Sequence, residues 1–247
     1  MTALLQKEPK ANCVYVADNA NFPYGEKTHE EVVECVISVV EKICRRFEPS
    51  VIVLACNTIS VNALEILRQR FPQIKFVGTV PAIKLAASVS QKKRIGLLAT
   101  SSTCENPYNM ELKNKFAADC QLIMRADANL ISYIEENGFT ATEIELENAV
   151  RPAIEFFREK DCDVIILGCT HFLNIRHIFE KLALRHVQGT QTIQIVDSVD
   201  GVVRHALDIG EVRPQKDFIP CLFVTGESNS SYEIICSRYN IHFGGNI

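Results

Sequence analysis

The chain contains two similar stretches, Val51-Ile-Val-Leu-Ala-Cys56-Asn57-Thr58 and Val164-Ile-Ile-Leu-Gly-Cys169-Thr170-His171. Each begins with an apolar run rich in β-branched residues, which is typical of a buried parallel strand, and the polar residues that follow predict a turn into a helix. In open α/β sheets, ligands bind beyond the carboxyl ends of such strands. We therefore expect both thiols to face one cleft, where they could transfer protons.

Composition is that of an ordinary globular enzyme. The 247 residues are 47% hydrophobic, which suffices for packed cores, and the formal net charge is −4. No run of basic residues could follow a phosphate backbone, so we expect no nucleic-acid partner.

The N-terminus lacks the apolar stretch of a signal peptide, and no apolar run approaches transmembrane length. We therefore expect a cytoplasmic protein with no membrane partner. The ten cysteines are spread along the chain without a CxxC pair, which favours reduced thiols over a disulfide framework.

Strand and helix patterns alternate along the chain, as in a mainly parallel α/β protein. Two helices have capping boxes, one opening at Thr28 with Glu31 and the other at Thr142 with Glu145, and Pro152 should kink or split the second helix. The expected strands cover residues 13–17, 51–55, 74–77, 94–99, 121–124, 164–167, 193–196 and 221–224. The repeat of the two cysteine strands predicts two similar lobes.

A cysteine is most often a small buried hydrophobe, and this is our interpretation for Cys35, Cys44, Cys120 and Cys162. Cys56 and Cys169 differ from these because both occupy the same place in the same local pattern. A helix amino terminus stabilises a thiolate, and the neighbouring Asn and Thr side chains could bind a substrate carboxylate or simply cap the helices.

Alternative chemistries fit the sequence less well. Cys169 and His171 could ligate zinc, but no second ligand pair has zinc-site spacing. A cysteine hydrolase with Cys56 as nucleophile and His171 as base leaves Cys169 unexplained. No dinucleotide or P-loop signature follows an expected strand, so chemistry without a cofactor or metal is the simplest expectation.

The two cysteine motifs resemble those of the cofactor-independent glutamate racemases, within the aspartate/glutamate racemase family. Further similar segments occur in the same order: Tyr15-Val-Ala-Asp18 with Pro23-Tyr24-Gly25, then Leu98-Ala-Thr100 to Thr103, then Ile195-Val-Asp197-Ser198. The resemblance spans nearly the whole chain. It implies two pseudo-symmetric α/β lobes with the active site in the cleft between them, the first lobe being 1–84 plus 198–247 and the second 85–197.

The resemblance also implies roles for individual residues. Cys56 and Cys169 would lie on opposite sides of the substrate α-carbon, with His171 assisting Cys169. Glu135 would be an assisting carboxylate, with its neighbour Glu136 as the alternative. The substrate glutamate would be bound by Tyr24, Gly25, Asn57, Thr58, Thr100, Thr103, Thr170 and His171. A homodimer is compatible with the resemblance.

One departure concerns the N-terminus. The family begins with a strand ending in an Asp-Ser-Gly turn, and Met1-Thr-Ala-Leu-Leu5 resembles the sequence just after that turn. We therefore expect a start placed too late or a truncation, which would leave a gap in a sheet and put activity of these residues alone in question.

The sequence thus predicts cofactor-independent interconversion of L- and D-glutamate, an isomerase activity that would supply D-glutamate for peptidoglycan synthesis. Two alternatives stay open. One is a racemase of another amino acid such as aspartate, and the other is a non-catalytic relative that binds an anion or a protein.

Overall fold

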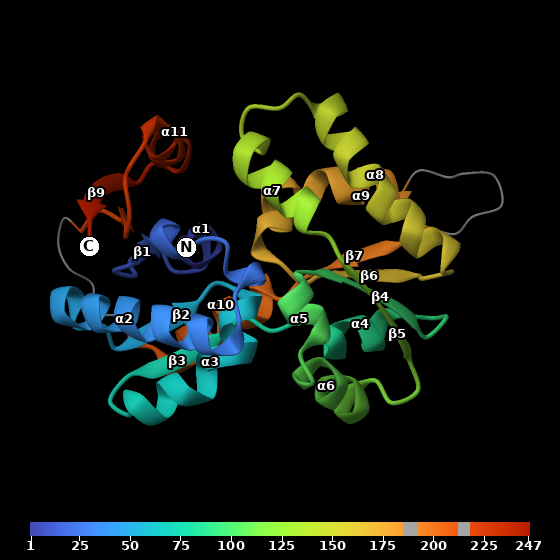
Figure 1. Cartoon of the computed structure of the whole chain (residues 1–247), viewed down its shortest axis with the longest axis horizontal. Coiled ribbons are helices and arrows are strands. Elements are labelled where there is room, and N and C mark those ends of the chain that lie inside the picture. The colour runs from blue at the N-terminus through green and yellow to red at the C-terminus, as the bar shows by residue number, and fades with distance from the viewer. Residues whose placement is uncertain (185–191, 212–217) are drawn as a thin grey trace. The chain divides into compact units, whose positions relative to one another are not determined.

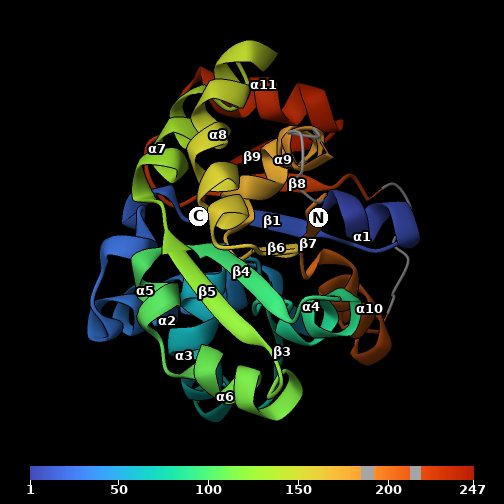
Figure 2. The same ribbon diagram turned by 90° about the vertical axis from the view of Figure 1, so that its right-hand side faces the viewer.

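A computed structural model describes residues 1–184, 192–211 and 218–247, which form a mixed α/β protein (Figures 1 and 2). It divides into unit 1, Met1–Leu54, Asn62–Val77 and Val199–Ile247, and unit 2, Ala55–Val61 and Gly78–Ser198. The segment with Cys56 therefore groups with the strand of Cys169. The lobe boundaries expected from the sequence stay a prediction, and both expected lobes include residues outside the described ranges.

Unit 2 is built on a four-stranded parallel sheet. Its strand order is β5 (Gln121–Ala126), β4 (Arg94–Ala99), β6 (Val164–Leu167) and β7 (Gln194–Val196). All four strands were predicted from their apolar runs, β4 and β6 with the observed bounds. Because β4 and β6 pair in parallel, their carboxyl ends, including the end before Cys169, lie at one edge of the sheet.

Helices cover both faces of this sheet, with α7, α8 and α9 on one face and α4 and α6 on the other (Figure 1). Side chains alternate along β6: Ile165 and Leu167 belong to the first core, whereas Val164 and Ile166 belong to the second. The helices of this unit are α4 (Ile83–Val89), α5 (Ser101–Glu105), α6 (Tyr108–Phe116), α7 (Ala128–Asn137), α8 (Glu143–Glu159), the 3₁₀ helix η3 (Thr170–Ile175) and α9 (Arg176–Leu184).

Helix α8 confirms the second capping box, since Thr142 and Glu145 satisfy each other's backbone N–H groups. The helix is not split at Pro152, which lies inside one continuous element. Its apolar face is buried at Leu146, Val150, Ala153, Ile154 and Phe157. Amphipathic packing against the sheet therefore outweighs the lost proline donor.

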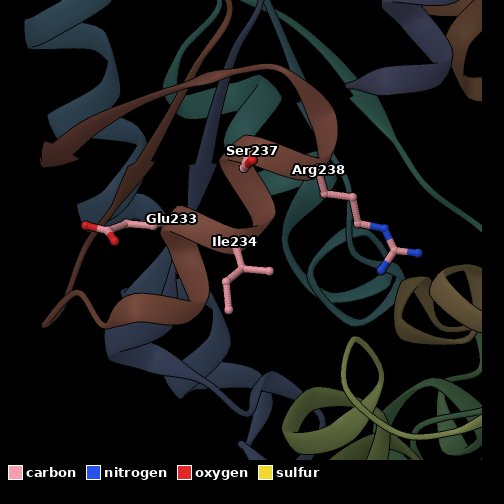
Figure 3. Close-up of a pocket in the computed structure, with 4 residues that line it drawn as sticks. All are labelled: Glu233, Ile234, Ser237 and Arg238. Carbon is pink, nitrogen blue, oxygen red and sulfur yellow. The ribbon is translucent and has the colours of Figure 1, made fainter.

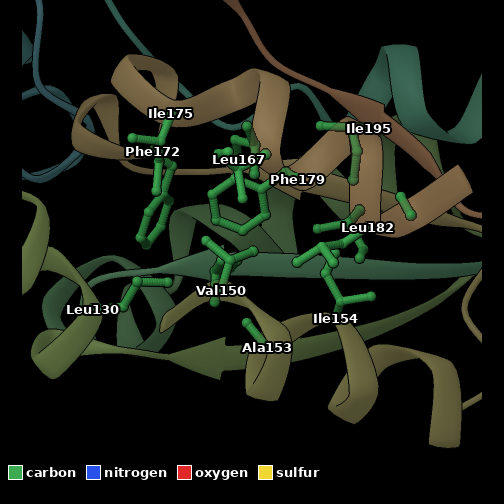
Figure 4. Packing of buried hydrophobic residues seen from close by; sticks show 14 of the residues in the cluster. Leu130, Val150, Ala153, Ile154, Leu167, Phe172, Ile175, Phe179, Leu182 and Ile195 are labelled. Carbon is green, nitrogen blue, oxygen red and sulfur yellow. The ribbon is translucent and has the colours of Figure 1, made fainter. Parts of the chain in front are cut away.

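The core beneath α8 and α9 also fixes η3, the segment after Cys169. Figure 4 shows Phe172 and Phe179 projecting into the cluster between the sheet and α8. Both rings are fully buried and meet edge to face, with centroids 5.7 Å apart. Because Phe172 is locked in this way, its neighbour His171 is held close to the strand end.

At the opposite edge of the sheet, the buried carboxylate of Asp163 organises the turn before β4. It accepts a hydrogen bond from the Ser90 hydroxyl at 2.6 Å. It also accepts the backbone N–H groups of Gln91 at 2.6 Å and Lys92 at 2.8 Å. These charge-assisted bonds join two connections at the amino ends of β4 and β6.

Unit 1 contains two sheets. The first is parallel, in the order β1 (Val14–Ala17), β8 (Cys221–Val224) and β9 (His242–Asn246), and the second pairs β2 (Val51–Leu54) with β3 (Lys75–Gly78). Its helices are α1 (Thr2–Lys7), η1 (Asn19–Asn21), η2 (Tyr24–Glu26), α2 (His29–Phe47), α3 (Asn57–Arg70), α10 (Val199–Ile209) and α11 (Ser230–Tyr239), of which α3 begins in unit 2.

Helix α2 confirms the first capping box, formed by Thr28 and Glu31, and buries Val32, Val36, Val39 and Val40. Cys35 and Cys44 lie in this helix and are partly exposed, although we interpreted them as buried hydrophobes. Cys120 and Cys162 in unit 2 are buried, as we expected. In the described chain, no helix is long and apolar enough to cross a membrane.

Candidate active site

The sulfur of Cys56 occupies the capping position of α3. Burial raises the pKa of this thiol, and the backbone N–H groups of Ile59 and Thr58 and the Thr58 hydroxyl oppose the rise. The strand, cysteine and helix thus follow one another as the sequence predicts, and the helix terminus presents donors to the thiol.

Asn57, the next residue, contributes an unusual buried donor. Its side chain is 3% exposed, and its amide nitrogen Nδ2 is buried with no hydrogen-bond partner among the described residues. A buried amide N–H group without a partner is costly, so such groups are rare in folded proteins. A donor of this kind beside a thiol fits a site that binds a carboxylate or carbonyl oxygen.

Three threonine hydroxyls meet next to Cys56. The Thr58 hydroxyl lies 3.0 Å from that of Thr100 and 3.4 Å from that of Thr103. Thr100 and Thr103 are themselves 3.0 Å apart, and Thr100 caps α5 by accepting the backbone N–H of Thr103. The structure therefore brings Thr58 together with Thr100 and Thr103, which the sequence placed on a separate segment.

Cys169 has different surroundings. It precedes the 3₁₀ helix η3 but makes no side-chain cap bond, and its sulfur lies 3.4 Å from Nδ1 of His171. The other ring nitrogen, Nε2, lies 3.0 Å from Oε2 of Glu135 at the end of α7. Of the two candidate carboxylates, Glu135 makes this hydrogen bond, and Thr170 lies between the cysteine and the histidine at the start of η3.

The surroundings of Cys169 shift the pKa values of two groups, His171 and Glu135. Burial lowers the pKa of His171, but its hydrogen bonds to Cys169 and Glu135 and their negative charges outweigh burial and raise the pKa to about 10. The hydrogen bond from His171 holds the pKa of Glu135 below its usual value, against the opposing effect of burial. At neutral pH, the histidine therefore carries its proton and the glutamate is ionised.

The two cysteines are electrostatically coupled. Burial raises the pKa of Cys56 to about 11, the Ile59 N–H opposes this, and the charge of Cys169 raises it further. A negative charge on Cys169 thus disfavours the thiolate form of Cys56. Both residues belong to unit 2.

The sequence analysis missed two residues that hold the turn at Cys56. The Ser60 hydroxyl donates to the Cys56 carbonyl at 2.8 Å and accepts the Thr79 backbone N–H at 2.8 Å. Both side chains are buried. The only sequence signal for Ser60 was its position four residues after Cys56, on the side of α3 that faces the protein interior.

Gly168, directly before Cys169, has no room for a side chain. A Cβ atom there would lie 2.6 Å from Leu97 Cδ1 and 3.1 Å from the Leu98 carbonyl oxygen. The Gly168 N–H donates to that same carbonyl at 2.7 Å. Glycine therefore lets β6 remain close to β4 up to the cysteine itself.

Tyr24 and Gly25 lie in unit 1, in η2. Tyr24 is buried, and its hydroxyl donates to Asp18, which also accepts the hydroxyl of Thr225. The Tyr24 hydroxyl is thus hydrogen-bonded within unit 1. The backbone N–H groups of this turn are the remaining candidates for contacts with a ligand.

Neither a group of metal-ligating side chains nor the surface depression on α11 adds to this site. No group of three or more His, Cys, Asp or Glu side chains within residues 1–184, 192–211 and 218–247 is arranged to hold a metal ion. Figure 3 shows a pocket on α11 lined by Glu233, Ile234, Ser237 and Arg238, with the two charged side chains directed away from each other. It contains none of the predicted site residues.

Comparison with known proteins supports the family resemblance of the two cysteine motifs. Residues 1–206 match the family model of the Asp/Glu/hydantoin racemases. The glutamate racemase of Treponema pallidum strain Nichols is 40% identical over 242 residues, covering 98% of this chain and 88% of the relative. That of Bartonella henselae is 37% identical over 237 residues, covering 95% and 87%.

Solved structures show the same fold. Escherichia coli glutamate racemase, in complex with L-glutamate and the activator UDP-MurNAc-Ala, superposes with a TM-score of 0.84 at 29% identity, covering all of this chain and 92% of that one. The RacE1 glutamate racemase of Bacillus anthracis has a TM-score of 0.81 at 24% identity, covering 99% and 91%. The chain belongs to the Asp/Glu/hydantoin racemase family.

Proposed function

We propose that this chain interconverts L- and D-glutamate by proton transfer between the substrate Cα and two thiols, without a cofactor. The observation that carries the proposal is that Cys56 and Cys169 lie in one unit, close enough for the charge of Cys169 to raise the pKa of Cys56. The curated relatives that are similar over most of the chain are glutamate racemases, which favours glutamate as the substrate.

In the proposed reaction, the thiolate of one cysteine removes the Cα proton and becomes a thiol. The electron pair of the broken C–H bond stays on Cα, which becomes a carbanion. The other cysteine, starting as a thiol, delivers its proton to the opposite side of Cα and becomes a thiolate. The two sulfurs exchange protonation states and the net charge is unchanged. The effect of the Cys169 charge on Cys56 supports this, because it disfavours the presence of two thiolates at once.

The surrounding residues have distinct proposed roles. The unpartnered amide of Asn57, together with Thr58 and Thr170, would donate hydrogen bonds to substrate carboxylates and stabilise the charge that develops at Cα. Protonated His171, held by Glu135, would exchange a proton with Cys169. The backbone of Tyr24 and Gly25 would contact the substrate as well.

We also propose the wider role expected from the sequence, in which the product D-glutamate serves peptidoglycan synthesis in the cytoplasm. All ten cysteines are free, which fits a reducing compartment. The partner would be the small amino acid, with neither nucleic acid nor membrane involved, and a homodimer is compatible with this role.

The test is hydrogen exchange at Cα in deuterated water, followed by NMR for L-glutamate, D-glutamate and both enantiomers of aspartate. Exchange with inversion of glutamate alone is the expected result. Preference for aspartate would overturn the assigned substrate, and no exchange with any amino acid would favour the non-catalytic binding protein.

Cysteine variants separate racemisation from hydrolysis. Cys56→Ser and Cys169→Ser should each abolish racemisation, whereas Cys35→Ser, on α2, should leave it unchanged. A hydrolase with a single nucleophile would tolerate Cys169→Ser, so retention of activity in that variant would contradict the two-thiol mechanism.

A further inference from the structure

The segment that carries His171 is anchored at both ends. At its start, the Gly168 N–H donates to the Leu98 carbonyl at 2.7 Å, which holds the end of β6 against β4. At its end, Arg176 follows η3 and begins α9, and its backbone N–H donates to the Leu173 carbonyl. The position of the imidazole between these ends depends on both anchors.

The Arg176 side chain ties this junction to the neighbouring strand β7. Its Nη1 atom forms an ion pair with Oδ2 of Asp197, and its Nη2 atom donates to the Ile195 carbonyl at 3.4 Å. Its Nε atom lies 2.7 Å from Oε1 of Glu180, one helical turn further along α9. The first two contacts join η3 and α9 to the sheet, whereas the third stays within the helix.

Asp197 lies at the sheet edge that carries the thiol. Strands β6 and β7 are parallel and Ile166 pairs with Val196, so Asp197 follows β7 at the level of Leu167. Cys169 comes two residues after that leucine in the sequence. The ion pair is therefore built beside the end of the strand that leads into Cys169 and η3.

A charged pair is an expensive way to hold a helix against a sheet. The Asp197 side chain is 6% exposed, whereas that of Arg176 is 39% exposed. A buried carboxylate loses its hydration, and apolar side chains of similar size often give equal or greater stability. The adjacent hydrophobic cluster, which includes Ile175 and Ile195, already supplies such packing (Figure 4). The distinctive contribution of the guanidinium is direction, because its planar donors fix the geometry of what they join.

His171 requires such a fixed geometry because its two ring nitrogens contact different elements. Nδ1 lies 3.4 Å from the Cys169 sulfur at the start of its own segment, and Nε2 lies 3.0 Å from Oε2 of Glu135 on α7. Hydrogen bonds weaken when distance or angle departs from the preferred range. A small movement of η3 relative to α7 would therefore weaken at least one of the two contacts.

We propose that Arg176 and Asp197 are positioning residues for His171. By fixing the end of η3, they allow the imidazole to contact Cys169 and Glu135 at the same time. This role deepens the proposed function and rests on it where turnover is concerned, because that function assigns the imidazole a proton exchange with the thiol. The geometry of the imidazole itself is a property of the free protein and is measured there.

The test is the titration of His171 in the full chain without substrate, followed by NMR of the ring nitrogens in protein labelled with ¹⁵N-histidine. The signal is assigned by its absence from His171→Gln. Burial lowers the pKa of His171, but the hydrogen bonds to Cys169 and Glu135 outweigh burial and raise it to about 10, so weaker contacts lower the midpoint. Arg176→Gln and Asp197→Asn should each lower it by about one pH unit, the equivalent of one hydrogen bond.

These two variants separate positioning from a direct effect of charge. Arg176→Gln removes a positive charge and Asp197→Asn removes a negative one. A direct effect on the imidazole would therefore raise the midpoint in the first variant and lower it in the second. Positioning predicts a fall in both, and opposite shifts or unchanged midpoints would overturn the proposal.

A double variant keeps the test decisive if Arg176→Gln fails to fold, since that change takes a cation away from the buried Asp197 carboxylate. The combination of Arg176→Gln with Asp197→Asn removes both charges and leaves the net charge unchanged. Positioning again predicts a midpoint lower by about one unit, the loss of one hydrogen bond. A direct charge effect predicts nearly the wild-type midpoint, because the two substitutions cancel.

Two substitutions are matched controls. Glu180→Gln removes the other carboxylate that pairs with Arg176, but this carboxylate is half exposed and lies within α9, so the midpoint should stay that of the wild type. Asp163→Asn removes a buried carboxylate with three hydrogen bonds at the opposite edge of the same sheet, so it lowers stability without disturbing η3. A fall of similar size in either control would contradict the proposed anchor.

Racemase kinetics keep this proposal distinct from the proposed function. If both hold, Asp197→Asn lowers kcat with little change in KM, because the imidazole acts on the thiol. A lowered His171 midpoint in a chain that racemises no amino acid would uphold the anchor and refute the proposed function. An unchanged midpoint in an active enzyme would refute the anchor alone.

Discussion

His171 is joined to Glu135 by a hydrogen bond of 3.0 Å between Nε2 and Oε2, on the side of the ring away from Cys169. The glutamate is half exposed, whereas the imidazole is mostly covered. A carboxylate in this position fixes the ring orientation and stabilises its protonated form.

Glu135→Gln should therefore lower kcat/KM by about ten-fold, the lower range for loss of a supporting carboxylate. Without the glutamate charge, the pKa of His171 should fall, which moves the alkaline limb of the pH-rate profile to lower pH. Steady-state rates across pH measure both effects. Glu136→Gln, at the adjacent position, should behave as the wild type, and equal losses in both variants would refute the special role of Glu135.

The stability contributed by His171 should depend on pH. Its pKa is raised in the folded protein from 6.5 to about 10, so the folded state binds the proton more tightly than the unfolded chain. This contribution is fully present below pH 6.5 and is lost as pH rises toward 10. The melting temperature of His171→Gln should be furthest below that of the wild type at pH 6 and approach it by pH 9.5, and a constant difference would contradict the assignment.

Asp163→Asn should destabilise the fold by about 2 kcal/mol, because a buried carboxylate that accepts three hydrogen bonds loses its charge and one acceptor. Urea unfolding measures the change. The control is Asp161→Asn, two residues earlier, where an exposed carboxylate contacts Lys92 and little change is expected. Comparable losses would show that Asp163 does not act through its buried contacts.

Gly168→Ala should cost about 1–3 kcal/mol, because the added methyl group must displace Leu97 or separate β4 from β6. Racemase activity should fall as well, since Cys169 is the next residue. Gly201→Ala, in α10, meets open space and should raise stability through better helix propensity. Thermal melts of the two variants should move in opposite directions.

Sequence patterns predicted most of the sheet framework, because continuous apolar runs such as those of β4 and β6 have few alternatives to a buried strand. The same criterion missed β9, whose His-Phe-Gly-Gly-Asn sequence has the residues least typical of strands. Gly244 is required there because a Cβ would lie 2.3 Å from the Phe223 ring. That need is set by a neighbouring strand and is not visible in the local sequence.

The site was predictable in its residue types but not in its contacts. Repeated motifs identified Cys56 and Cys169, and resemblance supplied Glu135, yet nothing in the sequence places Thr100 against Thr58. Such contacts depend on how β4 and α5 pack beside the start of α3. The two thiols also have unlike surroundings, one directly before the α-helix α3 and the other 3.4 Å from a histidine nitrogen, although their sequence patterns are nearly the same.

The uncompensated amide of Asn57 makes the empty protein less stable than its packing alone would allow. An anionic amino acid that accepts this hydrogen bond would remove the penalty as well as add its own contacts, so occupancy and folding are thermodynamically linked. The fold thus keeps a buried donor whose hydrogen bond a carboxylate ligand would complete. The melting temperature in the presence of each amino acid would therefore measure which amino acid binds best, without any catalysis.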